Sequence, residues 1–141
     1  MSAGESPTPD RLTVGQLMRS PATTVEADSH VASAAYLMKR SQVSALVITA
    51  DDEGHIPIAV ITDADVSHAV ADGKDLNDTR INQLHLPRPE ALGTGTSVPE
   101  AAERMLALGV EHLPVVSDGR LVGVADLVEV CRALLRERPA S

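Results

Sequence analysis

Apolar positions in the first half of the chain follow the period of a helix and then that of buried strands. Between residues 29 and 40 they have the spacing of one helix face, at Val31, Ala34, Ala35 and Met38. Two apolar runs follow at 45–49 and 58–61, and each has the length of a buried strand. A second helical stretch spans about 63–72. Before all of these come a short helical segment and an extended piece, at about 13–18 and 23–25.

The second half of the chain shows the same succession of elements. They are predicted as a short helical segment, a longer helix, two strands and a last helix, at about 80–85, 97–108, 113–116, 121–124 and 126–137. Ser97 opens the longer helix with a capping-box sequence, and Gly109 is a typical stop signal after it. Asp118-Gly119 between the two strands is a strong hairpin signal.

These two halves are copies of one unit. A constant offset of 67 positions maps Val14 onto Ile81, Val31 onto Val98 and Met38 onto Met105. After the hairpin turn the offset falls to 64, because the first copy carries three extra residues within 52–57. Such an insertion in a turn has a small entropic cost. A repeated unit of this size cannot bury its own sheet, so the two copies are expected to pack together.

The repeat divides the chain into four parts. We expect a flexible N-terminal tail at 1–10, which is rich in Ser, Pro and small polar residues. The first copy then spans 11–78, the second spans 79–138, and a short tail follows at 139–141. The order of elements predicts an α+β fold with two β-α-β-β-α repeats, whose sheets pack in a pseudo-twofold module.

Composition excludes several classes of function. With 43% apolar residues but no Phe, no Trp and one Tyr, the chain can build a core but offers no aromatic platforms for stacking bases. Its net charge of −8 disfavours nucleic acid and anionic membranes as partners, since both are bound through Lys and Arg. No signal peptide or long apolar run is present, so a cytoplasmic protein is expected.

Catalytic and metal-binding motifs are also missing from the sequence. Five His residues lack the spacing of metal ligands, and there is no phosphate loop or catalytic triad. The single cysteine, Cys131, lies in a helical stretch and is expected to be a small buried apolar residue. The sequence therefore predicts neither an enzyme nor a metalloprotein, and no cofactor is required.

The repeated unit resembles a CBS domain, the module named for cystathionine β-synthase. The resemblance rests on Pro114-Val115-Val116, a short turn and Gly123-Val124 entering a helix, together with the matching 46–48 and 59–65 of the first copy. It covers about residues 12–136. Members of this family occur as pairs, bind adenosine-containing ligands such as AMP, ADP, ATP, S-adenosylmethionine or NAD between the copies, and associate as dimers through their helices. The resemblance therefore implies a possible bound adenine nucleotide and a homodimer. In such a dimer Ala32, Ser33, Ala35, Ala101 and Ala102 would allow close helix approach, although these residues could equally pack within the monomer.

The first copy matches the ligand motif of the family at Thr62 and Asp65. In family members the Asp binds the ribose hydroxyls and the Ser or Thr lies by the phosphate. A carboxylate can accept hydrogen bonds from two vicinal hydroxyls, and the N–H groups at a helix start can bind an anion. The resemblance places the base near Val43, Ser44 and Ala45, with Thr23 or Thr24 nearby. Candidate phosphate-binding cations are Lys39, Arg40, Arg80 and Arg120.

The same tetrapeptide also has a structural interpretation. Thr62 followed by Asp65 resembles a capping box at the start of a helix, and this role can coexist with ligand binding. Where the family motif has Gly, the first copy has Ala59, which would add a methyl group near the cleft.

The second copy departs further from the motif. It has Asp126 and Glu129 at the equivalent positions and retains Gly123. Glu129 could reach ribose hydroxyls, whereas the Asp126 carboxylate would occupy the helix start and repel a phosphate. This site is therefore expected to be empty, structural or suited to a neutral or cationic adenosyl group. His112 and Pro114 lie where the family lines its cleft, so they are further candidates for ligand contact.

Two functions from different classes remain open at this point. The first is a regulatory module that senses an adenosyl ligand and signals to a separate, unknown effector protein. The second is a ligand-free module for dimerisation or protein docking, with degenerate nucleotide sites. Intact Thr62 and Asp65 favour the first, while Ala59, Asp126 and Glu129 favour the second.

Overall fold

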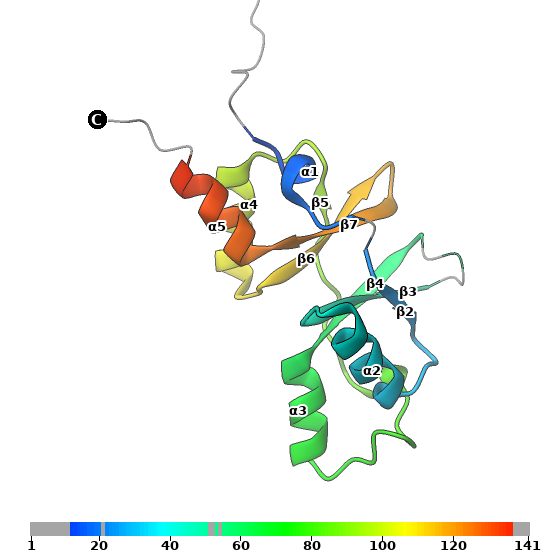
Figure 1. The fold of residues 1–141 in the computed structure, drawn as a ribbon. Coiled ribbons are helices and arrows are strands. Elements are labelled where there is room, and N and C mark those ends of the chain that lie inside the picture. The colour runs from blue at the N-terminus through cyan, green and yellow to red at the C-terminus, as the bar shows by residue number, and fades with distance from the viewer. Residues whose placement is uncertain (1–11, 21, 51–52, 54, 137–141) are drawn as a thin grey trace, which may run out of the picture.

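The computed structural model describes residues 12–20, 22–50, 53 and 55–136 (Figure 1). The two predicted tails, 1–10 and 139–141, lie outside the described residues. The first half contains α1, β2, α2, β3, β4 and α3, at Val14–Leu17, Thr24–Glu26, Val31–Ser41, Ala45–Thr49, Pro57–Thr62 and Asp63–Ala71. The second half contains the 3-10 helix η1, β5, α4, β6, β7 and α5, at Ile81–Gln83, Leu92–Gly93, Val98–Leu108, His112–Ser117, Arg120–Asp126 and Leu127–Arg136. The predicted order of elements is confirmed.

Each copy forms its own three-stranded sheet, in the orders β2-β3-β4 and β5-β6-β7. In both sheets the first pair is parallel and the second is antiparallel. The antiparallel register shifts at equivalent places, after Ile48 in the first copy and after Val115 in the second. The two sheets meet where β4 lies against β6. The α+β class and the two β-α-β-β-α repeats are therefore confirmed.

The long helix of each copy ends in the same way. Gly109 follows α4 with a φ of 69°, in the left-handed conformation that glycine adopts without strain. Gln42 follows α2 at the equivalent position with a φ of 58°, and its N–H bonds the carbonyls of Met38 and Lys39. The stop at Gly109 was predicted from the sequence. The stop at Gln42 was not, because the residue is not a glycine.

The two lead-in segments, α1 and η1, pack on the opposite copies. Val14 in α1 is buried in the core that α4, β6 and α5 form, and its N–H donates to the carbonyl of Thr96 at 2.8 Å. Ile81 in η1 is buried in the core of the first copy, and its N–H donates to the carbonyl of Ser29 at 2.9 Å. Figure 1 shows α1 in the same lobe as β5 and α5, away from α2 and α3. Each core therefore includes side chains from the other half of the chain.

The longer hairpin loop of the first copy also reaches the second copy. The carbonyl of His55 accepts a hydrogen bond from the N–H of Leu121 at 2.7 Å, and the guanidinium of Arg120 lies 2.8 Å from the His55 ring. The inserted residues thus end beside the hairpin of β6 and β7.

Two expectations about side chains need correction or restatement. Ala101 and Ala102 are buried in the core of the second copy, so they pack within the monomer and offer no face to a second chain. Cys131 is half-buried and not fully buried as expected. Among the described residues, no helix has the length and apolar character needed to cross a membrane.

Candidate ligand-binding cavities

Two cavities lie between the copies. The smaller, of about 360 Å³, is lined by Arg19, Thr23, residues 42–45, His112, Val124 and Asp126. The larger, of about 570 Å³, is lined by Val60, residues 62–65, residues 87–90 and residues 108–113. We call them the Asp126 cavity and the Asp65 cavity after the motif carboxylate in each. Both volumes lie in the range typical of small-molecule sites.

The repeat relates the two cavities to each other. The offset of 67 carries 42–45 onto 109–112, and the offset of 64 carries Thr62 onto Asp126. Each cavity thus combines the strand start and lead-in stretch of one copy with the helix start of the other. A ligand in either cavity would contact both copies.

Thr62 and Asp65 form a capping box at the start of α3. The Thr62 hydroxyl accepts from the Asp65 N–H at 3.2 Å, and one carboxylate oxygen of Asp65, Oδ2, accepts from the Thr62 N–H at 2.8 Å. The Thr62 hydroxyl also donates to this oxygen at 3.0 Å. The structural interpretation of the tetrapeptide is therefore confirmed. The second oxygen, Oδ1, has no hydrogen-bond partner among the described residues, so it can accept from a ligand hydroxyl.

Asp126 takes the corresponding place at the start of α5. Its Oδ1 accepts from the N–H of Val128 at 2.8 Å and of Glu129 at 3.3 Å. The carboxylate thus occupies the helix start, as expected from the sequence. An incoming phosphate cannot use these N–H groups without displacing it.

His112 lies between the cavities and lines both of them. Its Nε2 is 3.4 Å from Asp126 Oδ2 and 3.4 Å from the hydroxyl of Ser44 in the other copy. The side chain is 12% exposed, and Nδ1 is buried with no hydrogen-bond partner in the described part of the chain. His112 therefore lies at both cavities, and its contact with a ligand stays a prediction.

The structure separates residues that the sequence placed in one site. Val43, Ser44 and Ala45 line the Asp126 cavity, while Thr62 and Asp65 line the Asp65 cavity. The expectation that one ligand would use both groups is wrong. The physical reason is the crossing of the copies, which sets the strand start of one against the helix start of the other.

Three further candidates lie away from the cavity walls. Thr23 lines the Asp126 cavity, but Thr24 pairs with Val47 in the sheet and is not among the lining residues. Pro114 is buried in β6 opposite Val124. Glu129 points along α5, where its carboxylate pairs with Arg132 at 3.0 Å.

The cations at the cavities are not those expected from the sequence. Arg19 lines the Asp126 cavity and Arg88 lines the Asp65 cavity. The side chains of both are exposed and have no partner among the described residues. The expected candidates Lys39, Arg40, Arg80 and Arg120 are absent from both linings, and three of them bond Tyr36, the Asp28 carbonyl and His55 respectively. Both arginines lie in the lead-in stretch of their copy, where no regular spacing marks a side chain as facing a cavity.

The glycine of the second copy is explained by chain packing. A Cβ at Gly123 would lie 2.8 Å from the carbonyl oxygen of Arg19 and 2.6 Å from the sulfur of Met18. Its counterpart Ala59 is buried in the core of the first copy and is not among the residues lining either cavity. The expected methyl group near the cleft is therefore placed in the core.

Comparison with known proteins finds the same two copies. The model of the CBS domain matches residues 14–72 and again residues 81–136. The chain is 26% identical over 118 residues to the CBS domain-containing protein CBSCBSPB1 of Arabidopsis thaliana, with 83% of this chain covered. The match covers 21% of that relative, so this chain spans about a fifth of its length.

Two solved structures share the fold. The CBS domain protein PAE2072 from Pyrobaculum aerophilum, complexed with AMP, is 26% identical with a TM-score of 0.81, covering 89% of this chain and 97% of that one. Hypoxic Response Protein I, with two coordinated zinc ions, is 26% identical with a TM-score of 0.73, covering 90% of this chain and 99% of that one. In the described part of this chain, no group of three or more His, Cys, Asp or Glu side chains is placed to hold a metal ion.

Proposed function

Because this chain belongs to the CBS domain family, whose model matches both of its copies, we propose that it is a regulatory module for an adenosine-containing ligand. The observation that carries the proposal is the construction of each cavity from both copies. A ligand that contacts both copies changes the free energy of their packing, which is the physical basis of a signal. The signal would pass to a separate effector protein.

The Asp65 cavity offers the chemistry that an adenosyl ligand needs. Asp65 Oδ1 is available to a ribose hydroxyl, while Oδ2 is held by Thr62 and fixes the carboxylate. Val60, Leu108 and Val110 provide apolar surface for a base. The AMP bound by the Pyrobaculum relative supports this class of ligand. None of these groups requires a catalytic role, and we propose a binding function alone.

Asp65→Ala is expected to weaken binding of an adenosyl ligand in the Asp65 cavity at least tenfold, about 1.4 kcal/mol, because a ribose hydroxyl loses its acceptor. The measurement is calorimetric titration with AMP, ADP, ATP, S-adenosylmethionine and NADH. The variant also loses one capping hydrogen bond, from the Thr62 N–H.

Gln83→Ala is the matched control for that loss. Gln83 accepts the N–H of Arg80 at 2.7 Å at the start of η1, the same capping contact outside both cavities. We expect this variant to bind as the parent protein does. Absence of heat with every ligand at millimolar concentration would refute the proposed function.

The alternative is a ligand-free module for dimerisation or docking. It is favoured by large apolar side chains that are exposed on α4 and α5, at Leu106, Val128 and Leu135. Since these two helices pack together, a second copy of the chain could cover both. Dimer formation by itself is compatible with ligand binding. The alternative differs from the proposed function in that its nucleotide sites bind no ligand.

We expect the protein to sediment as a homodimer and the double variant Leu106→Glu, Leu135→Glu to sediment as a monomer. Two carboxylates in an apolar interface cost far more than the exposed side chains they replace. Sedimentation equilibrium measures the mass. Ile56→Glu, in an exposed loop of the first copy, is the control and should remain dimeric. A monomeric parent protein would contradict the expectation.

A further inference from the structure

We propose that the two cavities select adenosyl ligands by charge. The Asp65 cavity would take an uncharged or cationic adenosyl group, and the Asp126 cavity would take the one that carries a phosphate. This inference rests on the proposed function, since it names the ligand class of each cavity. It also reverses the expectation from the sequence, in which the Thr62 and Asp65 motif was the phosphate site.

The lining of the Asp65 cavity is acidic. Four carboxylates, those of Asp63, Asp65, Glu90 and Glu111, face one guanidinium, that of Arg88. Glu90 is ion-paired with Arg104, but Asp63 and Glu111 have no cationic partner among the described residues. A phosphate there would meet several like charges at once, whereas a sulfonium or an uncharged thioether would not.

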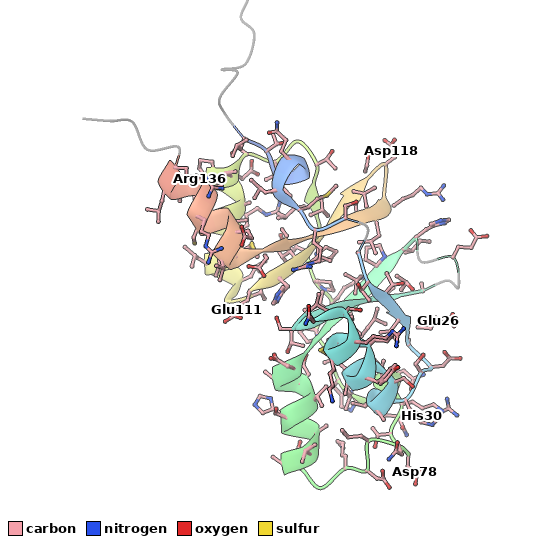
Figure 2. All side chains as sticks on the ribbon, in the orientation of Figure 1. Glu26, His30, Asp78, Glu111, Asp118 and Arg136 are labelled. Carbon is pink, nitrogen blue, oxygen red and sulfur yellow. The ribbon has the colours of Figure 1, made fainter. Side chains whose placement is uncertain are left out.

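Glu111 is the residue that most distinguishes this cavity. It is exposed and directly precedes β6, and Figure 2 shows it at the lower edge of the second copy. Its counterpart in the repeat is Ser44, a neutral residue in the Asp126 cavity. The same position thus carries a full negative charge in one cavity and a hydroxyl in the other.

The charge of the Asp126 cavity is balanced. Its one carboxylate, Asp126, already accepts two N–H groups of α5 and lies beside His112. Its one cation, Arg19, has no side-chain partner among the described residues, so the guanidinium is available to a phosphate. The side chains of Thr23, Gln42 and Ser44 add neutral donors to the same lining. A phosphate here would be held by Arg19, without using the occupied helix start.

The test compares AMP with 5′-methylthioadenosine, which has the same adenosine group but no phosphate. Calorimetry on the full chain should show that Arg19→Gln weakens AMP at least tenfold and leaves methylthioadenosine within twofold. Glu111→Gln should strengthen AMP binding in the Asp65 cavity several-fold, because one of the like charges around the phosphate is removed. Arg136→Gln and Glu103→Gln make the same charge changes at exposed positions outside both cavities, and Figure 2 shows Arg136 at the far end of α5.

The results distinguish a failure of the charge-selection inference from a failure of the proposed function. The charge selection alone would be overturned if Arg19→Gln weakened both ligands equally. It would also be overturned if AMP competed with methylthioadenosine for a single site in the parent protein. Binding of neither ligand would overturn the proposed function and this inference with it. The substitutions are confined to exposed side chains, so each variant should unfold at the same temperature as the parent protein. A variant that does so but binds neither ligand counts against the inference.

Discussion

Ile81→Ala is expected to lower the free energy of unfolding of the protein by about 2–5 kcal/mol, because this first residue of η1 is buried in the core of the other copy. Ile81 is 2% exposed and packs with Val25, Val31 and Ile48 in the core of the first copy. Removing most of its side chain leaves a cavity that β-sheet and helix neighbours can fill only partly. Urea unfolding followed by circular dichroism measures the loss.

Ile56→Ala serves as the control, because Ile56 is 50% exposed and the same truncation should stay within about 0.5 kcal/mol of the parent. The crossing of the lead-in segments also predicts how the chain unfolds. Since Val14 completes the core of the second copy and Ile81 that of the first, the copies should unfold in a single transition. If Ile81→Ala speeds up amide hydrogen exchange in one copy only, that result would contradict the coupling of the two copies.

The sequence predicted the elements of both copies because each signal is local. Helical spacing at Val31, Ala34 and Met38, and the turn at Asp118-Gly119, arise from neighbouring residues and do not depend on what lies across the core. The constant offset then confirmed each element by a second example. The α+β class and the paired arrangement followed from that repeat.

The crossing of the two copies could not be predicted in the same way. Val14 and Ile81 are both apolar and occupy the same register, so their pattern fits a core in either copy. The resemblance likewise placed Val43–Ala45 and Asp65 in one site, although they line different cavities. Only the three-dimensional arrangement shows that the strand start of one copy faces the helix start of the other.

The cations were missed for a related reason. Arg19 and Arg88 lie in stretches without regular spacing, where no period marks a side chain as facing a cavity. Positive charge alone favoured four other residues equally as phosphate-binding candidates, namely Lys39, Arg40, Arg80 and Arg120. The capping box at Thr62 was predictable, because its geometry is fixed by four consecutive residues.

Gly123→Ala is expected to destabilise the protein by about 1–3 kcal/mol, because the added methyl group has no room. It would lie 2.8 Å from the backbone oxygen of Arg19, and that backbone is fixed to β7 by two hydrogen bonds with Val124, of 2.9 and 3.0 Å. The lead-in stretch therefore cannot move away without breaking them. Met18 is more flexible and can adjust.

The control is Gly95→Ala, since a Cβ at Gly95 meets no atom within 4 Å and its φ is not in the left-handed region. That variant should stay within about 0.5 kcal/mol of the parent in urea unfolding. The effect of the substitution also distinguishes a packing role of Gly123 from a role in ligand contact. If Gly123 is required because Arg19 and Met18 cross β7 there, the loss of stability must appear without any ligand. A variant as stable as the parent that binds ligand less tightly would instead assign Gly123 to the wall of the Asp126 cavity.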